Sequence, residues 1–163
     1  MSFINKCADF IATGAYVGKA PKAPGTLATA ASLPLVWLIN QAGAIPYLVI
    51  TGIIVVLGLV ASSIYEEVHK SHDDGSIVID EVAGILITMA MLPMTWQAFV
   101  CGFLIFRFLD ILKPFPIGYL DKKVPGGAGV MADDVLAGII GNIILQLLLA
   151  RTTLLGVQIE TGW

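Results

Sequence analysis

The sequence predicts an all-α, membrane-embedded helical bundle of about five hydrophobic helices plus an N-terminal amphipathic helix. Three observations support this fold class. Of the 163 residues, 57% are hydrophobic and only 13% are charged, whereas ordinary soluble domains carry about 25% charged residues. The mean hydropathy is +0.88. The apolar residues also fall into separate runs, one of which has the length that a membrane helix needs.

The amphipathic helix is expected at the start of the chain. There the apolar residues Phe3, Ile4, Cys7, Phe10 and Ile11 recur at helical spacing. A helix with one such face lies on a membrane surface or on the rest of a bundle. The segment that follows, VGKAPKAPG, is rich in proline, lysine and glycine and is predicted to be a loop.

Five hydrophobic helices are expected after this loop. They are TLATAASLPLVWLINQAGA, IPYLVITGIIVVLGLVASSIYEE, IVIDEVAGILITMAMLPM, WQAFVCGFLIFRFLDILKPFP and DVLAGIIGNIILQLLLA. A long polar loop, rich in proline and glycine, is expected before the last of them. No repeat or linker divides the chain, so we expect a single domain over residues 1–163. A soluble bundle with an apolar core is the alternative, because short apolar runs occur in both kinds of protein.

Five helices that alternate through a bilayer would place nearly all charges on one side. This side would hold every Lys and Arg except Arg151 and every acidic residue except Glu160. Loops rich in Lys and Arg stay in the cytoplasm, so the charged side is expected to face it. The net charge of −3 and the lack of a basic stripe argue against a nucleic-acid partner.

Five carboxylates on this side form the main candidate site. Asp80 and Glu81 begin the third hydrophobic segment, Asp110 lies near the end of the fourth, and Asp133 and Asp134 begin the last. Helix capping is the alternative role for Asp80 and for one of the pair Asp133 and Asp134, because acidic residues are favoured in the first turn of a helix. Converging carboxylates repel one another, so we expect some to be protonated or bound to metal. A set of oxygen ligands suits Mg²⁺ or Mn²⁺.

Positive charges accompany the carboxylates. Arg107, Asp110 and Lys113 follow at intervals of three and should share one helix face. An ion-pair ladder is the simpler interpretation, but each pair gives only about 0.2–0.5 kcal/mol, less than the roughly 2.5–3.5 kcal/mol that a charge costs near a membrane centre. With Lys22, these two cations are suited to bind phosphate oxygens.

These residues indicate metal-assisted chemistry on a phosphate at a membrane surface, with an activated water as the nucleophile. A covalent aspartyl-phosphate on Asp110 is the alternative route. A small ion or proton carrier is the alternative function, because carboxylates inside a membrane are its usual sign.

The segments GKAPKAPGT, IVIDEVAG, RFLDILKPFP and VMADDVLAG, in this order, resemble phosphatidylglycerophosphatase A. The resemblance extends over about residues 14–142 and implies Mg²⁺-dependent hydrolysis of phosphatidylglycerophosphate to phosphatidylglycerol and phosphate. It implies a phospholipid substrate and a multi-pass location in the bacterial inner membrane. The implied metal ligands are Asp80, Glu81, Asp110, Asp133 and Asp134. The implied catalytic residues are Asp80, Arg107, Asp110 and Lys113, and the implied substrate-binding residues are Lys22, Gly25, Thr26, Arg107 and Lys113.

Overall fold

The structure, a computed structural model, describes residues 2–71, 74–124 and 126–157. Within these ranges all regular secondary structure is helical, which confirms the all-α prediction. The elements are α1 (Phe3–Ala12), the 3₁₀ helix η1 (Val17–Lys19), α2 (Pro24–Asn40), α3 (Ala44–His69), α4 (Ile79–Thr88), α5 (Trp96–Leu112), α6 (Ile117–Lys123) and α7 (Gly127–Arg151). The five predicted hydrophobic helices correspond to α2, α3, α4, α5 and α7, and the predicted amphipathic helix to α1.

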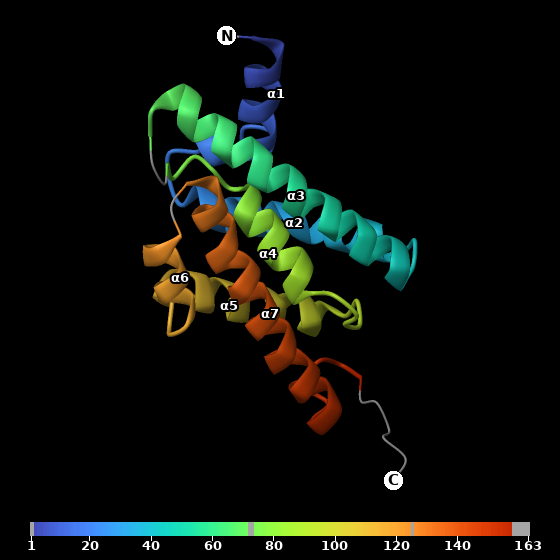
Figure 1. The fold of residues 1–163 in the computed structure, drawn as a ribbon. Coiled ribbons are helices and arrows are strands. Elements are labelled where there is room, and N and C mark those ends of the chain that lie inside the picture. The colour runs from blue at the N-terminus through green and yellow to red at the C-terminus, as the bar shows by residue number, and fades with distance from the viewer. Residues whose placement is uncertain (1, 72–73, 125, 158–163) are drawn as a thin grey trace.

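Helix α4 lies at the centre of the bundle and contacts α2, α3, α5 and α7 (Figure 1). The main core surrounds it and includes Leu86 from α4, Phe106 from α5 and Leu145 from α7, all fully buried. Gly84 lets the ring of Phe106 pack directly on the backbone of α4, because a Cβ there would overlap the ring. The hydroxyl of Tyr47 in α3 donates a hydrogen bond of 2.7 Å to the carbonyl of Leu86. The central helix is therefore held from several sides.

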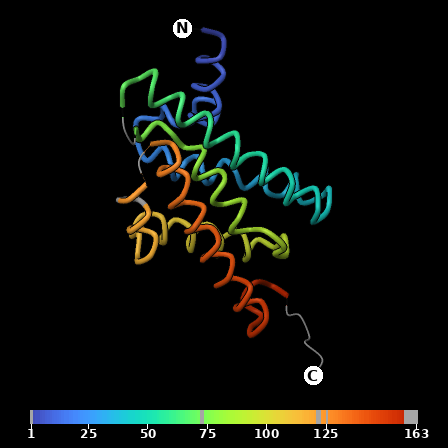
Figure 2. The backbone as a smooth tube through the Cα atoms, in the orientation of Figure 1, coloured from blue at the N-terminus to red at the C-terminus, as the bar shows by residue number. Residues whose placement is uncertain are grey.

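The helices are arranged so that the ends that carry charge meet at one side of the bundle. Figures 1 and 2 show that α2, α4 and α7 begin there and that α3 and α5 end there, on the left of both views. This follows from the alternating direction of consecutive hydrophobic helices, which the short connections require. The arrangement brings together acidic and basic residues that lie far apart in the sequence.

Helix α4 is shorter than the apolar segment that predicted it. It ends at Thr88 after 10 residues. The amide Nδ2 of Asn142 in α7 donates to the carbonyls of Thr88 at 2.9 Å and Ala90 at 2.8 Å, and Nε2 of Gln146 donates to Ala90 at 3.3 Å. Carbonyls at a helix end need partners, above all where water is scarce. Side chains of α7 thus allow α4 to end inside the bundle.

The surface of the bundle is apolar over long stretches. Helices α3 and α7 are the two that are long and apolar enough to cross a membrane within the described residues. Only 22% of the most apolar part of α3 is buried. Its exposed apolar side chains include Leu48, Val49, Ile53, Val56, Leu57 and Val60. A helix in the core of a soluble protein would bury such a face, so the exposed side chains indicate association with lipid.

The long loop predicted between Lys113 and Asp133 is only partly a loop. Helix α6 occupies Ile117–Lys123 and packs on α7, and this packing fully buries Ile117. Helix α7 begins at Gly127, earlier than predicted. The two aspartates therefore lie in its second turn, where they cannot cap the helix. This position excludes the capping interpretation for Asp133 and Asp134.

The close contact between α4 and α7 should be sensitive to a single methyl group. A Cβ on Gly138 would lie 2.7 Å from the carbonyl oxygen of Gly84, which is backbone and cannot turn away. We expect Gly138→Ala to lower the free energy of unfolding by about 1–3 kcal/mol, measured by thermal or denaturant unfolding in detergent. The control is Gly52→Ala in α3, where a Cβ meets no atom of the described chain within 4 Å. An unchanged stability of Gly138→Ala would contradict the proposed contact.

Candidate functional site

Three carboxylates from two helices meet where α4 begins and α7 passes it. Asp80 and Glu81 lie in the first turn of α4, and Asp134 lies in the second turn of α7. One oxygen from each can be chosen so that all three lie within 4.8 Å of one another. The contact between Gly84 and Gly138, one turn further along both helices, brings the two backbones close enough for this. The predicted convergence of these three residues is therefore present in the structure.

These carboxylates keep oxygen atoms that have no partner within the described chain. Oδ1 of Asp80, Oε2 of Glu81 and Oδ2 of Asp134 are buried and accept no hydrogen bond from the described residues. A buried polar atom without a partner costs about 1–3 kcal/mol, and more if it is charged. Nearby like charges raise this cost further. Because one oxygen from each of the three carboxylates lies within 4.8 Å of the others, and hard divalent cations take oxygen ligands, the donor set fits Mg²⁺ or Mn²⁺.

An arginine from α5 adjoins the three carboxylates. The guanidinium of Arg107 forms an ion pair with Asp110, one turn later in the same helix, and lies 3.6 Å from Oε1 of Glu81. Its side chain is 13% exposed, and its Nε is buried with no hydrogen-bond partner in the described part of the protein. Asp110 also interacts electrostatically with Asp134 and Glu81. The predicted proximity of Arg107 and Asp110 is thus present in the structure, and both lie beside the three carboxylates.

Lys113 is placed differently from the prediction. It was expected on the same helix face as Arg107 and Asp110, but α5 ends at Leu112 and Lys113 adopts a left-handed backbone with φ of 42°. Its Nζ donates to Oδ2 of Asp133 at 2.6 Å. The side chain of Asp133 is 5% exposed, so the protein itself supplies a positive charge beside this buried carboxylate. That Asp133 also binds metal remains a prediction.

The start of α2 forms a further wall of the site. A Cβ on Gly25 would overlap Oε1 of Glu81 and would lie 3.3 Å from Nη1 of Arg107. No side chain caps the start of α2, because its N-cap residue is an alanine. The partly positive end of the helix dipole therefore faces the carboxylates and the arginine. Thr26 is partly buried and Lys22 is exposed, and among the described residues neither side chain makes an ion pair or a hydrogen bond to the cluster.

Two structural roles in this site were not predicted from the sequence. Gly25 was assigned to substrate binding, but its lack of a side chain also makes room for Glu81. Gly84 was not singled out, although its backbone meets Gly138. A glycine inside a helix is a weak sign of close packing, and no local pattern says which helix it meets.

These features define a membrane-associated helical protein in which a candidate divalent-cation site adjoins an arginine and a helix N-terminus, an arrangement suited to binding a phosphate group. A family model described as "Phosphatidylglycerophosphatase A" matches residues 10–149. This match covers most of the chain, which therefore belongs to the phosphatidylglycerophosphatase A family.

Curated relatives agree with this assignment. A phosphatidylglycerophosphatase A of Haemophilus influenzae is 40% identical over 137 residues, covering 83% of this chain and 84% of the relative. A phosphatidylglycerophosphatase A of Escherichia coli K12 is 39% identical over 140 residues, covering 83% and 79%. A putative phosphatidylinositol-3-phosphatase of Bacteroides thetaiotaomicron is 33% identical over 145 residues, covering 83% and 89%. No solved structure matches the chain.

The space that Gly25 leaves for Glu81 can be tested by filling it. We expect Gly25→Ala to displace the Glu81 carboxylate and to weaken Mn²⁺ binding by about tenfold or more, as changes beside metal ligands commonly do. Isothermal titration of the purified protein with Mn²⁺ measures this. Gly52→Ala, which adds the same methyl group at an open position of α3, should bind Mn²⁺ as the unmodified protein does. Equal affinities for all three proteins would show that Gly25 does not control the position of Glu81.

Proposed function

We propose that this protein hydrolyses the phosphomonoester of phosphatidylglycerophosphate to phosphatidylglycerol and phosphate, a reaction of phospholipid biosynthesis. The observation that carries the proposal is the set of unpartnered carboxylate oxygens beside Arg107 in a chain of this family. Two of the relatives bear the name of this activity, and the third is named as a putative phosphatase of another phospholipid. A phosphate ester on a lipid is therefore the substrate class common to these names.

The proposed cofactor is Mg²⁺, with Mn²⁺ as a substitute. Asp80, Glu81 and Asp134 supply the ligands, because one carboxylate oxygen from each lies within 4.8 Å of the others. Asp110 and Asp133 add further negative charge beside these ligands. When bound, the metal would offset the negative charge of the phosphate and activate a water molecule.

The cationic groups of the chain are proposed to hold the phosphate. The guanidinium of Arg107 is suited to paired hydrogen bonds with two phosphate oxygens. The uncapped start of α2, at Gly25 and Thr26, offers backbone N–H groups to a third oxygen. Lys22 and Lys113 add positive charge near the membrane surface. Together these groups orient the phosphorus atom toward the carboxylates.

In the proposed reaction, the oxygen of water forms a bond to phosphorus while the bond from phosphorus to the lipid oxygen breaks. The lipid oxygen leaves with a proton, and inorganic phosphate is the second product. Asp110 is engaged by Arg107, which makes it a weaker nucleophile and favours direct attack by water over an aspartyl-phosphate. Asp80 is thus proposed to be essential as a metal ligand, and Asp110 is proposed to be essential because it orients Arg107.

The protein is proposed to cross the bacterial inner membrane several times, with the site facing the cytoplasm. The common position of the charged helix ends supports a single polar side (Figure 1), and Lys- and Arg-rich loops stay cytoplasmic. Such a location places the site at the depth of phospholipid headgroups. It also lets phosphate leave directly to the aqueous phase.

Removal of the metal should abolish the reaction. In detergent micelles that contain phosphatidylglycerophosphate, we expect phosphate release to stop with EDTA and to return when Mg²⁺ is added in excess, since the carboxylates alone repel the substrate. Colorimetric phosphate determination measures this. Phosphatidylinositol 3-phosphate serves as a second substrate and should react more slowly. Phosphate release that is unaffected by EDTA would contradict the metal site, and no release at all would favour an ion or proton carrier.

Asp110→Asn should lower the rate of phosphate release by about a hundredfold or more, because the neutral amide no longer fixes the guanidinium of Arg107 or contributes charge to the site. The fold should persist, since the side chain keeps its size. Glu67→Gln is the matched control: it also removes one negative charge, but from an exposed position near the end of α3. Helix content by circular dichroism should be equal in both variants. Full activity of Asp110→Asn would end its assignment to the site.

A further inference from the structure

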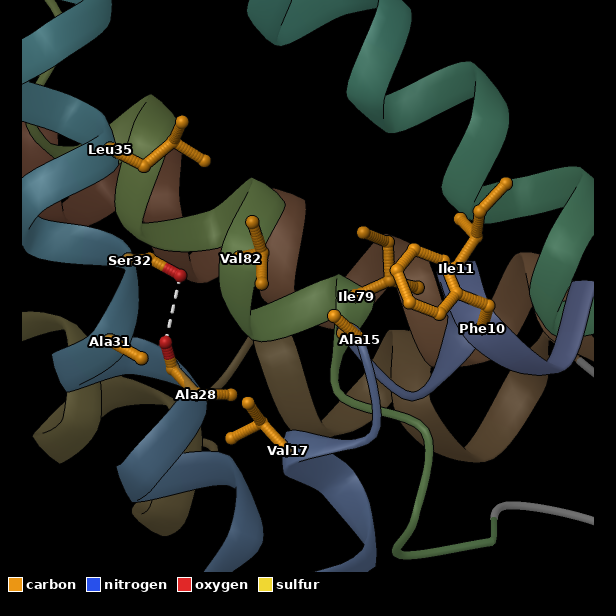
Figure 3. Close-up of a pocket in the computed structure, with 11 residues that line it drawn as sticks. Phe10, Ile11, Ala15, Val17, Ala28, Ala31, Ser32, Leu35, Ile79 and Val82 are labelled. Carbon is orange, nitrogen blue, oxygen red and sulfur yellow. Dashed lines mark hydrogen bonds between the residues drawn. The ribbon is translucent and has the colours of Figure 1, made fainter. Parts of the chain in front are cut away.

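An apolar cavity lies beside the proposed phosphate site and is not used by it. Its volume is about 390 Å³, within the range of small-molecule sites. Figure 3 shows that α1, the segment that includes η1, α2 and α4 form its walls, with Phe10, Val17, Ala31 and Val82 among the side chains that face it. Ser32 offers the cavity no free hydroxyl hydrogen, because its Oγ donates to the carbonyl of Ala28 at 2.7 Å. The cavity therefore suits a hydrocarbon ligand.

The cavity adjoins the polar site on two helices. On α4, Ile79 and Val82 line the cavity, and the two residues between them are carboxylates of the site. On α2, Ala28 lines the cavity one turn after Gly25, which touches Glu81. A single ligand that fills both places must be anionic at one end and apolar beyond it.

The mouth of the cavity is apolar and open. Phe10 is 48% exposed and Leu35 is 37% exposed at its rim. Further out on α1, Phe3 and Ile4 are 81% and 64% exposed. Side chains of this kind would lie in the interface of a bilayer. A lipid chain could thus enter from the membrane without crossing a polar surface.

A partly buried ion pair links the α1 wall of the cavity to η1. Asp9 of α1 is 9% exposed, and its Oδ2 accepts a hydrogen bond of 2.8 Å from Nζ of Lys19. This bond stabilises the charged form of Lys19 and raises its pKa above the ordinary value. The Nε2 atom of His69, at the end of α3, lies 3.5 Å from the other oxygen of Asp9. The wall is therefore fixed to the bundle by contacts that do not involve the phosphate site.

We propose that this cavity binds the part of one acyl chain nearest the glycerol of the phospholipid substrate. The proposal rests on the proposed function, because the cavity would receive the apolar end of the same ligand whose phosphate Arg107 and the start of α2 would hold. It assigns a subsite for the hydrocarbon to α1, η1, α2 and α4. The acyl chain of the substrate then contributes to binding before any chemical step begins.

A larger side chain that fills the cavity from α2 tests the proposed acyl-chain subsite. Ala31 is exposed on α2 and faces the cavity (Figure 3), whereas its neighbour Ala30 is exposed toward a different groove beside Phe99. We expect Ala31→Phe to lower kcat/KM about tenfold for dioleoyl phosphatidylglycerophosphate, a typical effect of pocket contacts with a few methylene groups. The same variant should be unchanged on the deacylated headgroup, glycerophosphoglycerophosphate. Ala30→Phe should match the unmodified protein on both substrates.

Three kinetic results would overturn the subsite: no loss in Ala31→Phe, an equal loss in both variants, or an equal loss on both substrates.

A labelling measurement that needs no turnover tests the subsite separately. Vesicles of phosphatidylglycerol with a diazirine close to the ester end of one acyl chain would label the peptides that contain Phe10 and Leu35. That labelling should fall severalfold in Ala31→Phe and persist in Ala30→Phe, and equal labelling in both would refute the subsite. If the unmodified protein released phosphate from neither substrate, the proposed function would fail, while the labelling would still decide the cavity.

Discussion

The structure depends on the contact between α4 and α7, where two helices approach so closely that only glycine fits between them. Gly138 meets the backbone of Gly84 there. One turn away, the same approach forces Asp80, Glu81 and Asp134 together. Helix packing thus provides the favourable energy that offsets the repulsion among the carboxylates. A site of this kind keeps its geometry because the surrounding core, and not the acidic residues themselves, determines it.

The charged residues of the site divide into two groups with different electrostatics. Asp133 has a lysine from its own chain at 2.6 Å, so its charge is offset internally. Asp80 and Asp134 each bring a carboxylate oxygen within 4.8 Å of one from Glu81. The two groups therefore differ in their neighbours: Asp133 lies beside a lysine, whereas Asp80 and Asp134 lie beside further carboxylates. Arg107 pairs with Asp110 and lies 3.6 Å from Glu81, while its Nε has no hydrogen-bond partner among the described residues.

The sequence predicted those features that local patterns determine. Long apolar runs identified the hydrophobic helices, and the positions of Asp80, Asp110 and Asp134 near helix ends were enough to bring them to one side of a bundle. Other features depend on residues distant in the chain. The end of α4 is satisfied by Asn142, 54 residues after Thr88, and nothing within the segment itself marks that end. The apolar cavity likewise needs α1 and α4 to meet, which no periodicity reveals.

The candidate metal ligands are divided between α4 and α7, and this division has a consequence for the whole fold. A bound ion would join the middle of the chain to its last helix and would close a loop that includes all of α5 and α6. Such a link stabilises the folded state by mass action, in proportion to the logarithm of the free ion concentration once the site is mostly filled. The resistance of this protein to heat would then vary with the concentration of the divalent cation that the candidate site binds.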